Sequence, residues 1–334
     1  MALLHLEGFE VADGINTYVG RKLNPGSQAD EWVTGRFGGK AMRLEYNNAV
    51  ALAFNNKQTI IIGLAINFET IEEDKAFLIL YESGTPQVSL AFGLYGSLRV
   101  VRDGNTLAET VNNLITRHAW HYIELKIKIH NSTGTAEIHV DGVEVANETS
   151  LDTQMTGNAY VDQVNLFPTR FEALSLYDDI YVADDSGSYN NDFLGDVRIV
   201  ATTPDADGSS TDFTLFPGGG EDHYEDVDDG STVDDDTTYV ESATATHEDL
   251  FTFVDLVDIG DILGVQIFTD ARESAGAESL GTSVRTYTID HDDTPQAVTG
   301  SYMIYSRIMD VEPENGIPWT SIIFNQAMFG VKVG

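Results

Sequence analysis

The chain has 334 residues, enough for about two domains that each bury a core of their own. Its 54 acidic residues outnumber 18 basic ones, and the resulting net charge of -36 repels a phosphate backbone, so we expect no nucleic-acid partner. It contains no cysteine, which excludes disulfides, thiolate metal sites and cysteine nucleophiles. A hydrophobic content of 42% is typical of a folded protein.

The chain opens on a segment, residues 1–10, that we interpret as a strand. It has no basic start and carries two carboxylates, so it does not resemble a secretory signal. The most apolar segment, residues 59–68, has about half the length that a bilayer requires, and carboxylates follow it. We therefore expect no insertion into a membrane.

Short apolar segments separated by Gly, Asn and Asp continue to about residue 183, a pattern that predicts an all-β sandwich. The clearest strand is 120–130, in which Ile123, Leu125, Ile127 and Ile129 alternate with polar residues. Two Asp-Gly pairs, Asp103-Gly104 and Asp141-Gly142, each lie between two expected strands. Asp-Gly between alternating segments predicts a tight hairpin, since the turn requires positive φ at both central residues.

The order of three segments in this region resembles the concanavalin A-like, laminin-G-like jelly roll. They are Trp120-His-Tyr-Ile-Glu-Leu125, Glu137-Ile-His-Val-Asp-Gly142 and Leu176-Tyr-Asp-Asp-Ile-Tyr-Val182. The resemblance covers about residues 1–183 and implies consecutive hairpin strands followed by a closing strand. It is specific for the fold and not for a function, because this sandwich serves lectins, glycosidases, adhesins and structural proteins.

A polar connector is expected at residues 184–192, where Asp, Ser, Gly and Asn cluster. Beyond it, residues 193–334 predict a second β-sandwich, with strands expected at 193–200, 250–256, 263–268, 283–290, 300–306 and 322–324. The apolar segment 319–333 is expected to close this domain or to cover a subunit contact. The fold class is therefore all-β, with a concanavalin A-like jelly roll at 1–183 and a second sandwich at 193–334.

The second half is strongly acidic, with 29 acidic and 5 basic residues between positions 191 and 334. Residues 221–236 include 9 carboxylates and no basic residue, which predicts a solvated loop. Residues 205–212 faintly resemble a calcium loop but lack its third acidic ligand and terminal Glu. We favour solvated loops, and the candidates for calcium are Asp205, Asp207, Asp212, Asp226, Asp228 and Asp229.

Catalytic patterns are largely missing from the sequence. The Glu-x-Asp-x-x-Glu arrangement of laminarinase-like jelly rolls does not occur. Asp178 and Asp179 are adjacent, so on a strand they should face opposite sides, one anchoring a loop and the other in solvent. His118 and His121 lack the helical context of a zinc pair and are expected to be ordinary core or surface residues. We therefore expect a protein that is not an enzyme.

The segment from about 176 to 216, with Asn190-Asn-Asp-Phe-Leu-Gly-Asp-Val-Arg198 and Pro204-Asp-Ala-Asp-Gly208, resembles structural proteins of tailed-bacteriophage virions. That resemblance implies a head or neck fibre, a decoration protein or a tail appendage, located in the virion, with other virion proteins as partners and a homo-oligomer, most simply a trimer. The alternative is a lectin-like module that binds a host or environmental glycan. Its candidate stacking residues are Tyr46, Tyr81, Tyr95 and Tyr160.

Overall fold

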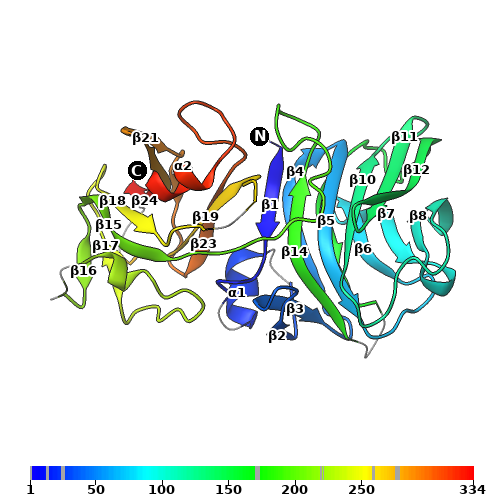
Figure 1. Cartoon of the computed structure of the whole chain (residues 1–334), viewed down its shortest axis with the longest axis horizontal. Helices are drawn as coiled ribbons and strands as arrows, with labels where there is room; N and C mark the ends of the chain where they lie inside the picture. The colour runs from blue at the N-terminus through cyan, green and yellow to red at the C-terminus, as the bar shows by residue number, and fades with distance from the viewer. Residues whose placement is uncertain are drawn as a thin grey trace. The chain divides into compact units, whose positions relative to one another are not determined.

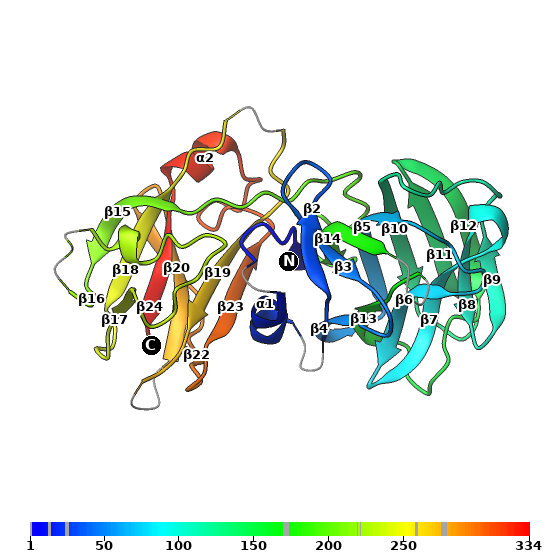
Figure 2. The ribbon, with the colours of Figure 1, turned by 90° about the horizontal axis from the view of Figure 1, so that it is seen from below.

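The computed structural model describes residues 2–12, 15–23, 27–169, 174–218, 220, 222–257, 260–274 and 279–334. The chain forms two compact units: Met1–Glu10 with Gly14–Val200, and Val11–Asp13 with Ala201–Gly334. Strands dominate both units (Figures 1 and 2). The expected connector at 184–192 lies within the first unit, because the division falls between Val200 and Ala201.

Two antiparallel sheets make the first unit. The eight-stranded sheet has the order β12 (Val143–Leu151), β11 (Gly134–Val140), β10 (His121–Lys128), β5 (Thr59–Phe68), β14 (Ser175–Ala183), β3 (Lys40–Leu44) and β2 (Glu31–Thr34), with β1 (Leu3–Glu7) also paired to β14. The six-stranded sheet has the order β4 (Val50–Lys57), β13 (Val161–Leu166), β6 (Ala76–Glu82), β7 (Thr85–Phe92), β8 (Leu98–Arg102) and β9 (Asn105–Glu109). The helix α1 (Ile15–Lys22) precedes β2, and the 3-10 turn η1 (Leu94–Gly96) joins β7 to β8.

The alternation expected in residues 123–129 is confirmed in β10. Ile123, Leu125 and Ile127 are buried, and they lie opposite Val140, Ile138 and Ala136 on β11 in antiparallel register. The two Asp-Gly hairpins are also confirmed. Asp103 and Gly104, like Asp141 and Gly142, have positive φ at both positions, as a tight hairpin turn requires.

The core of the first unit lies between its two sheets. Phe68 on β5 contacts Phe92 on β7 edge to face, with ring centroids 4.8 Å apart, and Phe92 stacks on Phe77 of β6 at 4.7 Å. All three rings are fully buried. Because removing such a ring typically costs about 3–5 kcal/mol, this trio holds the two sheets together.

The second unit is also a β-structure, with one larger sheet and two hairpin-sized ones. The larger sheet has the order β15 (Pro204–Thr211), β18 (Glu248–Phe253), β24 (Met328–Val333), β20 (Ser279–Thr286) and β21 (Ile289–Asp292), with β22 (Gln296–Ala297) paired to β20. The small sheets pair β16 (Thr214–Phe216) with β17 (Tyr239–Glu241) and β19 (Val265–Ala271) with β23 (Met303–Met309). The core contains Ile267, Val284, Met309, Trp319, Phe324, Ala327 and Phe329. An all-β chain with two sandwich-type units is thus confirmed.

Two segments beyond residue 192 differ from the expectation. Residues 193–200, expected as a strand, contain no strand, because their backbone amides bind side chains of the first unit, as that of Ile199 binds Asp179. Residues 322–324, expected as a strand, belong to the helix α2 (Ser321–Gln326). The Thr320 hydroxyl accepts a hydrogen bond from the amide of Ile323 at 3.2 Å, which caps the helix and satisfies a free amide of its first turn. The apolar strand β24 that follows is an interior strand of the larger sheet, where it pairs with β18 on one side and with β20 on the other.

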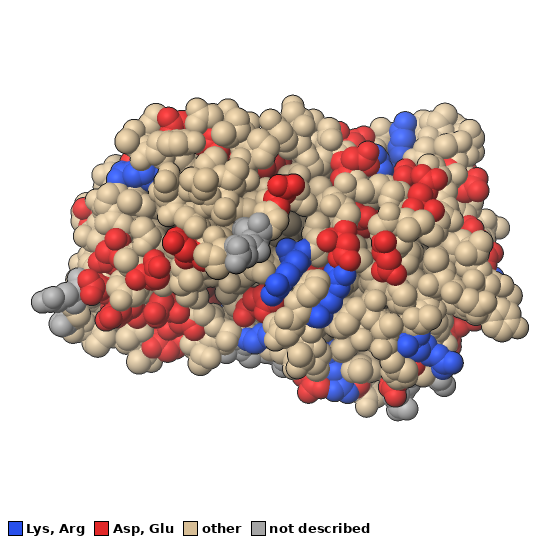
Figure 3. Space-filling model, in the orientation of Figure 1, with Lys and Arg blue, Asp and Glu red and all other residues tan. Residues whose placement is uncertain are grey.

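Acidic side chains dominate the surface. Figure 3 shows many more Asp and Glu than Lys and Arg on the visible face, in keeping with the net charge of -36. Among the described residues, no helix combines the length and the apolarity that a membrane crossing requires.

Candidate functional site

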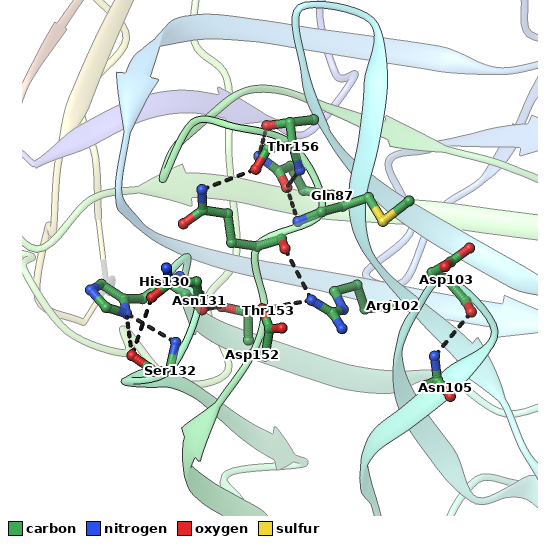
Figure 4. Close-up of polar contacts among 12 residues, drawn as sticks. Gln87, Arg102, Asp103, Asn105, His130, Asn131, Ser132, Asp152, Thr153 and Thr156 are labelled. Carbon is green, nitrogen blue, oxygen red and sulfur yellow. Dashed lines mark hydrogen bonds and ion pairs between the residues drawn. The ribbon is translucent and has the colours of Figure 1, made fainter.

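One end of the first sandwich carries a polar rim, which we define as the β8–β9 turn (103–105), the β10–β11 turn (130–133) and the loop 152–158 between β12 and β13. These segments meet because antiparallel neighbours turn back at the same end of their sheets. The loop 152–158 passes from the eight-stranded sheet to the six-stranded one and closes this end of the sandwich. Figure 4 shows its polar contacts.

The buried side chain of Gln87 on β7 fixes the loop 152–158 through hydrogen bonds. Its amide oxygen accepts hydrogen bonds from the amides of Met155 at 2.6 Å and Thr156 at 3.1 Å. Its amide nitrogen donates to the Thr156 hydroxyl at 2.8 Å (Figure 4). It also donates to the carbonyl of Asn158 at 2.9 Å. Gln87 is only 1% exposed, so these bonds replace water that cannot reach it. The loop therefore has a fixed conformation.

Two further contacts fix the start of the loop. Arg102 on β8 donates to the carbonyl of Gln154 at 3.0 Å and pairs with the Asp152 carboxylate at 2.6 Å (Figure 4). The buried Thr153 hydroxyl donates to the carbonyl of Lys128 at 2.7 Å and accepts from the amide of His130 at 2.9 Å. The loop and the β10–β11 turn are thereby joined in one polar network, and Arg102 directly precedes the β8–β9 turn.

The rim presents hydrogen-bonding groups beside an apolar side chain. Asp103, Asn105 and Asn131 are exposed, and their carboxylate and amides offer both donors and acceptors. Met155, which is 46% exposed, lies in the segment of the loop 152–158 that Gln87 holds. Rigid polar groups around an apolar surface suit a ligand with many hydroxyls and apolar C–H faces, since little entropy is lost in ordering the protein.

The four tyrosines proposed as a stacking platform come from different parts of the unit. Tyr81 lies on β6, and Tyr160 directly precedes β13, the strand that pairs with β6. Tyr46 follows β3 in a turn, and Tyr95 lies in η1 with 74% of its surface exposed. Tyr81 thus lies on β6 and Tyr160 lies directly before the neighbouring strand β13, whereas Tyr46 and Tyr95 lie in two separate turns.

The pair Asp178 and Asp179 departs from the expectation that one of them is solvated. Their exposures are 3% and 2%, because Asp179 has a φ of 47° and the pairing with β5 slips there, which breaks the strand alternation. Asp178 accepts from the amides of Arg36 and Asp179, each at 2.8 Å, and Asp179 accepts from that of Ile199 at 2.7 Å. Both carboxylates anchor backbone, and the prediction for the second one was wrong.

Burial shapes the protonation of this pair. It raises the pKa of Asp178 to about 7, and the neighbouring Asp179 charge adds to the rise. It also raises the pKa of Asp179 to about 6, against the amide of Ile199 and the Arg36 guanidinium, which favour the charged form. The guanidinium lies 3.9 Å from Asp179. Because the carboxylates lie under the segments that they anchor, we regard the pair as structural.

Three of the calcium candidates, Asp205, Asp207 and Asp212, lie in β15 or directly after it. A loop was expected there, and the structure has a strand. Asp205 accepts from the Thr252 hydroxyl at 2.9 Å. Asp207 accepts from two consecutive amides at the start of the 3-10 turn η2 (Tyr224–Asp226), at 3.0 and 2.8 Å. Asp212 accepts from the first amide of β18 at 3.2 Å. Each carboxylate thus serves a different local contact.

The other three candidates lie at η2 and after it. Burial raises the pKa of Asp226 and that of Asp229, which are half buried, whereas Asp228 is exposed. Asp229 accepts from the amide of Asp234 at 3.2 Å. None of the six candidates belongs to a group of three ligand atoms within 4.8 Å in the part of the chain that the structure describes. Calcium at these residues stays a proposal.

The histidines at 118 and 121 do not converge. His121 lies between two loops, with Nδ1 2.8 Å from Asp141 and Nε2 2.9 Å from the Thr116 hydroxyl. His118 is exposed in a turn with a φ of 59°. The two histidines thus lie in different local surroundings.

Two features of the site were not predicted from the sequence, the support of the rim by Gln87 and a cluster of ligating side chains on β11 and β12. Nothing in the sequence marks Gln87 as buried, because a glutamine beside a proline is ordinary on a surface. Glu137 and His139 alternate on the strand that was correctly predicted, and their spacing places them on one face. Their partner Glu144 joins them only through the register of the hairpin.

No protein-family model matches the chain, and no curated protein matches it in sequence. Solved structures do resemble it at low identity. Domain 4 of AbnA, a GH43 extracellular arabinanase from Geobacillus stearothermophilus, has 15% identity and a TM-score of 0.39 over 55% of this chain and 93% of that one. Peanut lectin has 9% identity and a TM-score of 0.32 over 48% of this chain and 92% of that one. These structures share with the first unit a fold built of β-sheets, which in this chain is a sandwich of two antiparallel sheets.

A third similar structure bears on catalysis. It is a carbohydrate esterase from the Shiga toxin-encoding bacteriophage phi24B, with 13% identity and a TM-score of 0.35 over 54% of this chain and 99% of that one. The solved structures that resemble the chain thus include proteins described as enzymes. The expectation that the chain is not an enzyme is corrected accordingly, because it rested on catalytic patterns missing from the sequence, and the absence of those patterns does not exclude catalysis on such a fold.

Proposed function

We propose that the first unit binds a glycan and that the rim is its binding surface. The observation that carries the proposal is the fixed loop 152–158, which Gln87 holds and in which Met155 is exposed, on the rim that also carries exposed polar side chains. A sugar offers hydroxyls to amides and carboxylates and an apolar C–H face to a side chain such as Met155. The fold likeness to a lectin accords with this proposal and does not carry it.

The chemistry of the rim favours a neutral or hydroxyl-rich ligand. Arg102 is already paired with Asp152, and Asp103 adds a negative charge, so an acidic sugar finds no free cation among these residues. The exposed amides of Asn105 and Asn131 are each able to donate and accept, which suits vicinal hydroxyls. We also propose calcium as an accessory ion in glycan binding, because sugar hydroxyls and carboxylates both supply the oxygen ligands that this ion takes.

A glycan array with the full chain tests the proposal, once with millimolar calcium and once with a chelator. Binding is then titrated for Asn105→Ala and Asn131→Ala at the rim. Asn112→Ala is the matched control, because this exposed amide follows β9 at the opposite end of the strands. We expect about tenfold weaker binding for the rim variants and no change for the control. A silent array in both conditions, or equal losses in all three variants, would overturn the proposal.

We propose as a second function that the protein is a structural component of a tailed-phage virion, assembled through the second unit as a trimer. An exposed apolar patch supports this, formed by Val254, Val257 and Ile322, of which Val257 is 74% exposed. Asn325 on α2 binds the amide and the carbonyl of Leu256, at 2.9 and 3.2 Å, which places α2, and with it Ile322, beside the segment that contains Val254 and Val257. Exposed apolar patches are typical of protein contacts.

Light scattering at low and high salt tests the assembly. A mass of about 110 kDa, three chains of 36.6 kDa, is expected for the trimer. The variant Val257→Asp should shift the mass to that of one chain, whereas Val143→Asp, which changes an exposed residue of the first unit, should not. A single chain at every salt concentration would contradict self-assembly in solution, and antibody labelling that finds no copy on purified virions would contradict the location.

A further inference from the structure

Three metal-ligating side chains meet on the hairpin of β11 and β12. The ligand atoms of Glu137, His139 and Glu144 all lie within 4.8 Å of one another. Glu137 and His139 are two residues apart on β11, so they share a face, and Glu144 lies directly opposite His139 on β12. Because the strands fix this register, the three side chains converge without help from a loop.

The imidazole of His139 has a fixed orientation. Its ring lies against that of Phe193, with centroids 4.1 Å apart, and its Nε2 lies 2.9 Å from Glu137 Oε1. The side chains of Glu137 and His139 are 26% and 20% exposed, and Glu144 is more open to solvent. The group is therefore partly enclosed, with one open side through which an ion and its water can enter.

The donor set defines the kind of ion. One imidazole nitrogen and two carboxylate oxygens suit zinc and similar first-row ions, whereas calcium and magnesium take oxygen ligands. Three protein ligands that leave a fourth position for water are the pattern of an open zinc site. In a tetrahedral zinc site, ligand atoms lie about 3.3 Å apart, so rotation of the two glutamate side chains is enough to close the group.

One cation lies beside the group and is already neutralised. Lys126 on β10 is opposite Glu137, and its ammonium is 2.9 Å from the Asp192 carboxylate. The Lys126–Asp192 pair adds no net charge, so the two glutamates attract a divalent ion with their full charge. Asn147 donates to Glu144 at 3.4 Å, a weak bond that leaves the other carboxylate oxygen available.

We propose that Glu137, His139 and Glu144 bind one divalent transition-metal ion, with zinc as the best fit. The site lies near the 141–142 turn, at the end of the hairpin away from the rim, so it is separate from the proposed glycan surface. It also differs from the calcium proposed for the aspartates of the second unit. Failure of either other proposal leaves this one intact.

Calorimetric titration of the full chain with ZnCl2 tests the site, together with CoCl2 as a spectroscopic probe. We expect about one tight zinc per chain and the strong visible absorption of tetrahedral cobalt. His139→Gln and Glu144→Gln should each weaken zinc binding by more than about tenfold and abolish the cobalt spectrum. Near-ultraviolet circular dichroism without metal should match the wild type, because both side chains lie at the surface.

Glu148→Gln and His118→Gln are the matched controls. Glu148 lies on the same strand as Glu144 but opposite Ala136, a core residue, and so on the other face, and His118 lies in a separate exposed turn. Both controls should bind zinc as the wild type does. Unchanged binding in the His139 and Glu144 variants, or equal losses in the controls, would overturn the proposal, as would a wild type that binds neither ion.

Discussion

The Tyr181 hydroxyl on β14 donates a hydrogen bond to Glu124 Oε1 on β10 at 2.5 Å, across the intervening strand β5. The same oxygen accepts from the amide of Gly195 at 2.8 Å, and the Tyr181 oxygen accepts from that of Leu194 at 3.2 Å. Burial and the Glu124 charge both raise the pKa of Tyr181. A buried carboxylate is thus satisfied by the segment that crosses over it, which explains why residues 194 and 195 belong to the first unit.

Gly63 on β5 makes this contact possible, since a Cβ there would lie 2.0 Å from the Tyr181 ring. Gly63→Ala should therefore lower the free energy of unfolding by about 1–3 kcal/mol through overpacking. Urea denaturation measures the change. Gly157→Ala is the control, because a Cβ at Gly157 meets nothing within 4 Å. Equal stability of the two variants would show that Tyr181 moves away without cost.

The raised pKa values of Asp178 and Asp179, about 7 and about 6, predict a pH dependence of stability. A carboxyl with a raised pKa in the folded state binds its proton more tightly there, so its contribution is complete below the unfolded pKa of 3.8 and is lost as the pH rises towards 7. Wild-type stability should thus fall between about pH 4 and pH 7, by a few kcal/mol at most.

Substitution separates this effect from the general repulsion of an acidic chain. Asp178→Asn should make the fall in stability between pH 4 and pH 7 smaller, because the amide does not titrate. Asp185→Asn removes an equal charge at an exposed position and should leave the slope as in the wild type. Unfolding midpoints at several pH values give both slopes, and parallel curves for the two variants would rule out the buried pair as the cause.

Gln87→Ala should release the loop 152–158, because it removes the acceptor for two amides that the loop itself does not satisfy. The expected cost is about 2–4 kcal/mol, with faster hydrogen exchange at Met155 and Thr156. Ser89→Ala, on the same strand with one hydrogen bond of 3.4 Å, should change neither quantity. Protection of the loop in the Gln87 variant equal to that of the wild type would contradict the support described here.

The second unit contains a comparable buried contact. Asp249 accepts from His223 Nδ1 at 2.6 Å and from the amide of Phe213 at 2.8 Å, and its side chain has no exposed surface. Asp249→Ala should destabilise the second unit by about 3 kcal/mol, because both partners lose their acceptor. Hydrogen exchange along β18 reports this locally. The exposed control Asp255→Ala should be neutral, and protection of β18 unchanged by Asp249→Ala would refute the expectation.

The sequence predicted the hairpins well because their signals are local. Alternation in residues 123–129 and the two Asp-Gly turns depend on neighbours in the chain, and the structure confirms them. It failed at Asp179, where a single residue with positive φ turns a carboxylate from solvent into the interior. The prediction of a strand at residues 322–324 was also wrong, because Thr320 caps the first turn of a helix there.

The candidate sites were beyond prediction for a different reason. Gln87 and the loop it supports are 68 residues apart, and the contact follows from a pairing of strands that no local pattern encodes. Glu144 meets His139 only because the hairpin slips by one residue between Ile138 and His139. Spacing in the sequence can identify ligand residues that share a face of one strand. The register between two strands, which the sequence does not show, determines whether a residue of the second strand lies beside them.

The pairing of β1 and β5 with β14 also bears on how the protein is made. Residues 3–7 lie against residues 180–183, so the eight-stranded sheet lacks a central strand until the ribosome has passed residue 183. The hairpin of β10 and β11 can form earlier, since its contacts are local. The strand β5, almost wholly apolar, thus lacks one of its two neighbours until β14 has been made, and an unpaired apolar edge of this kind is one at which another chain can pair.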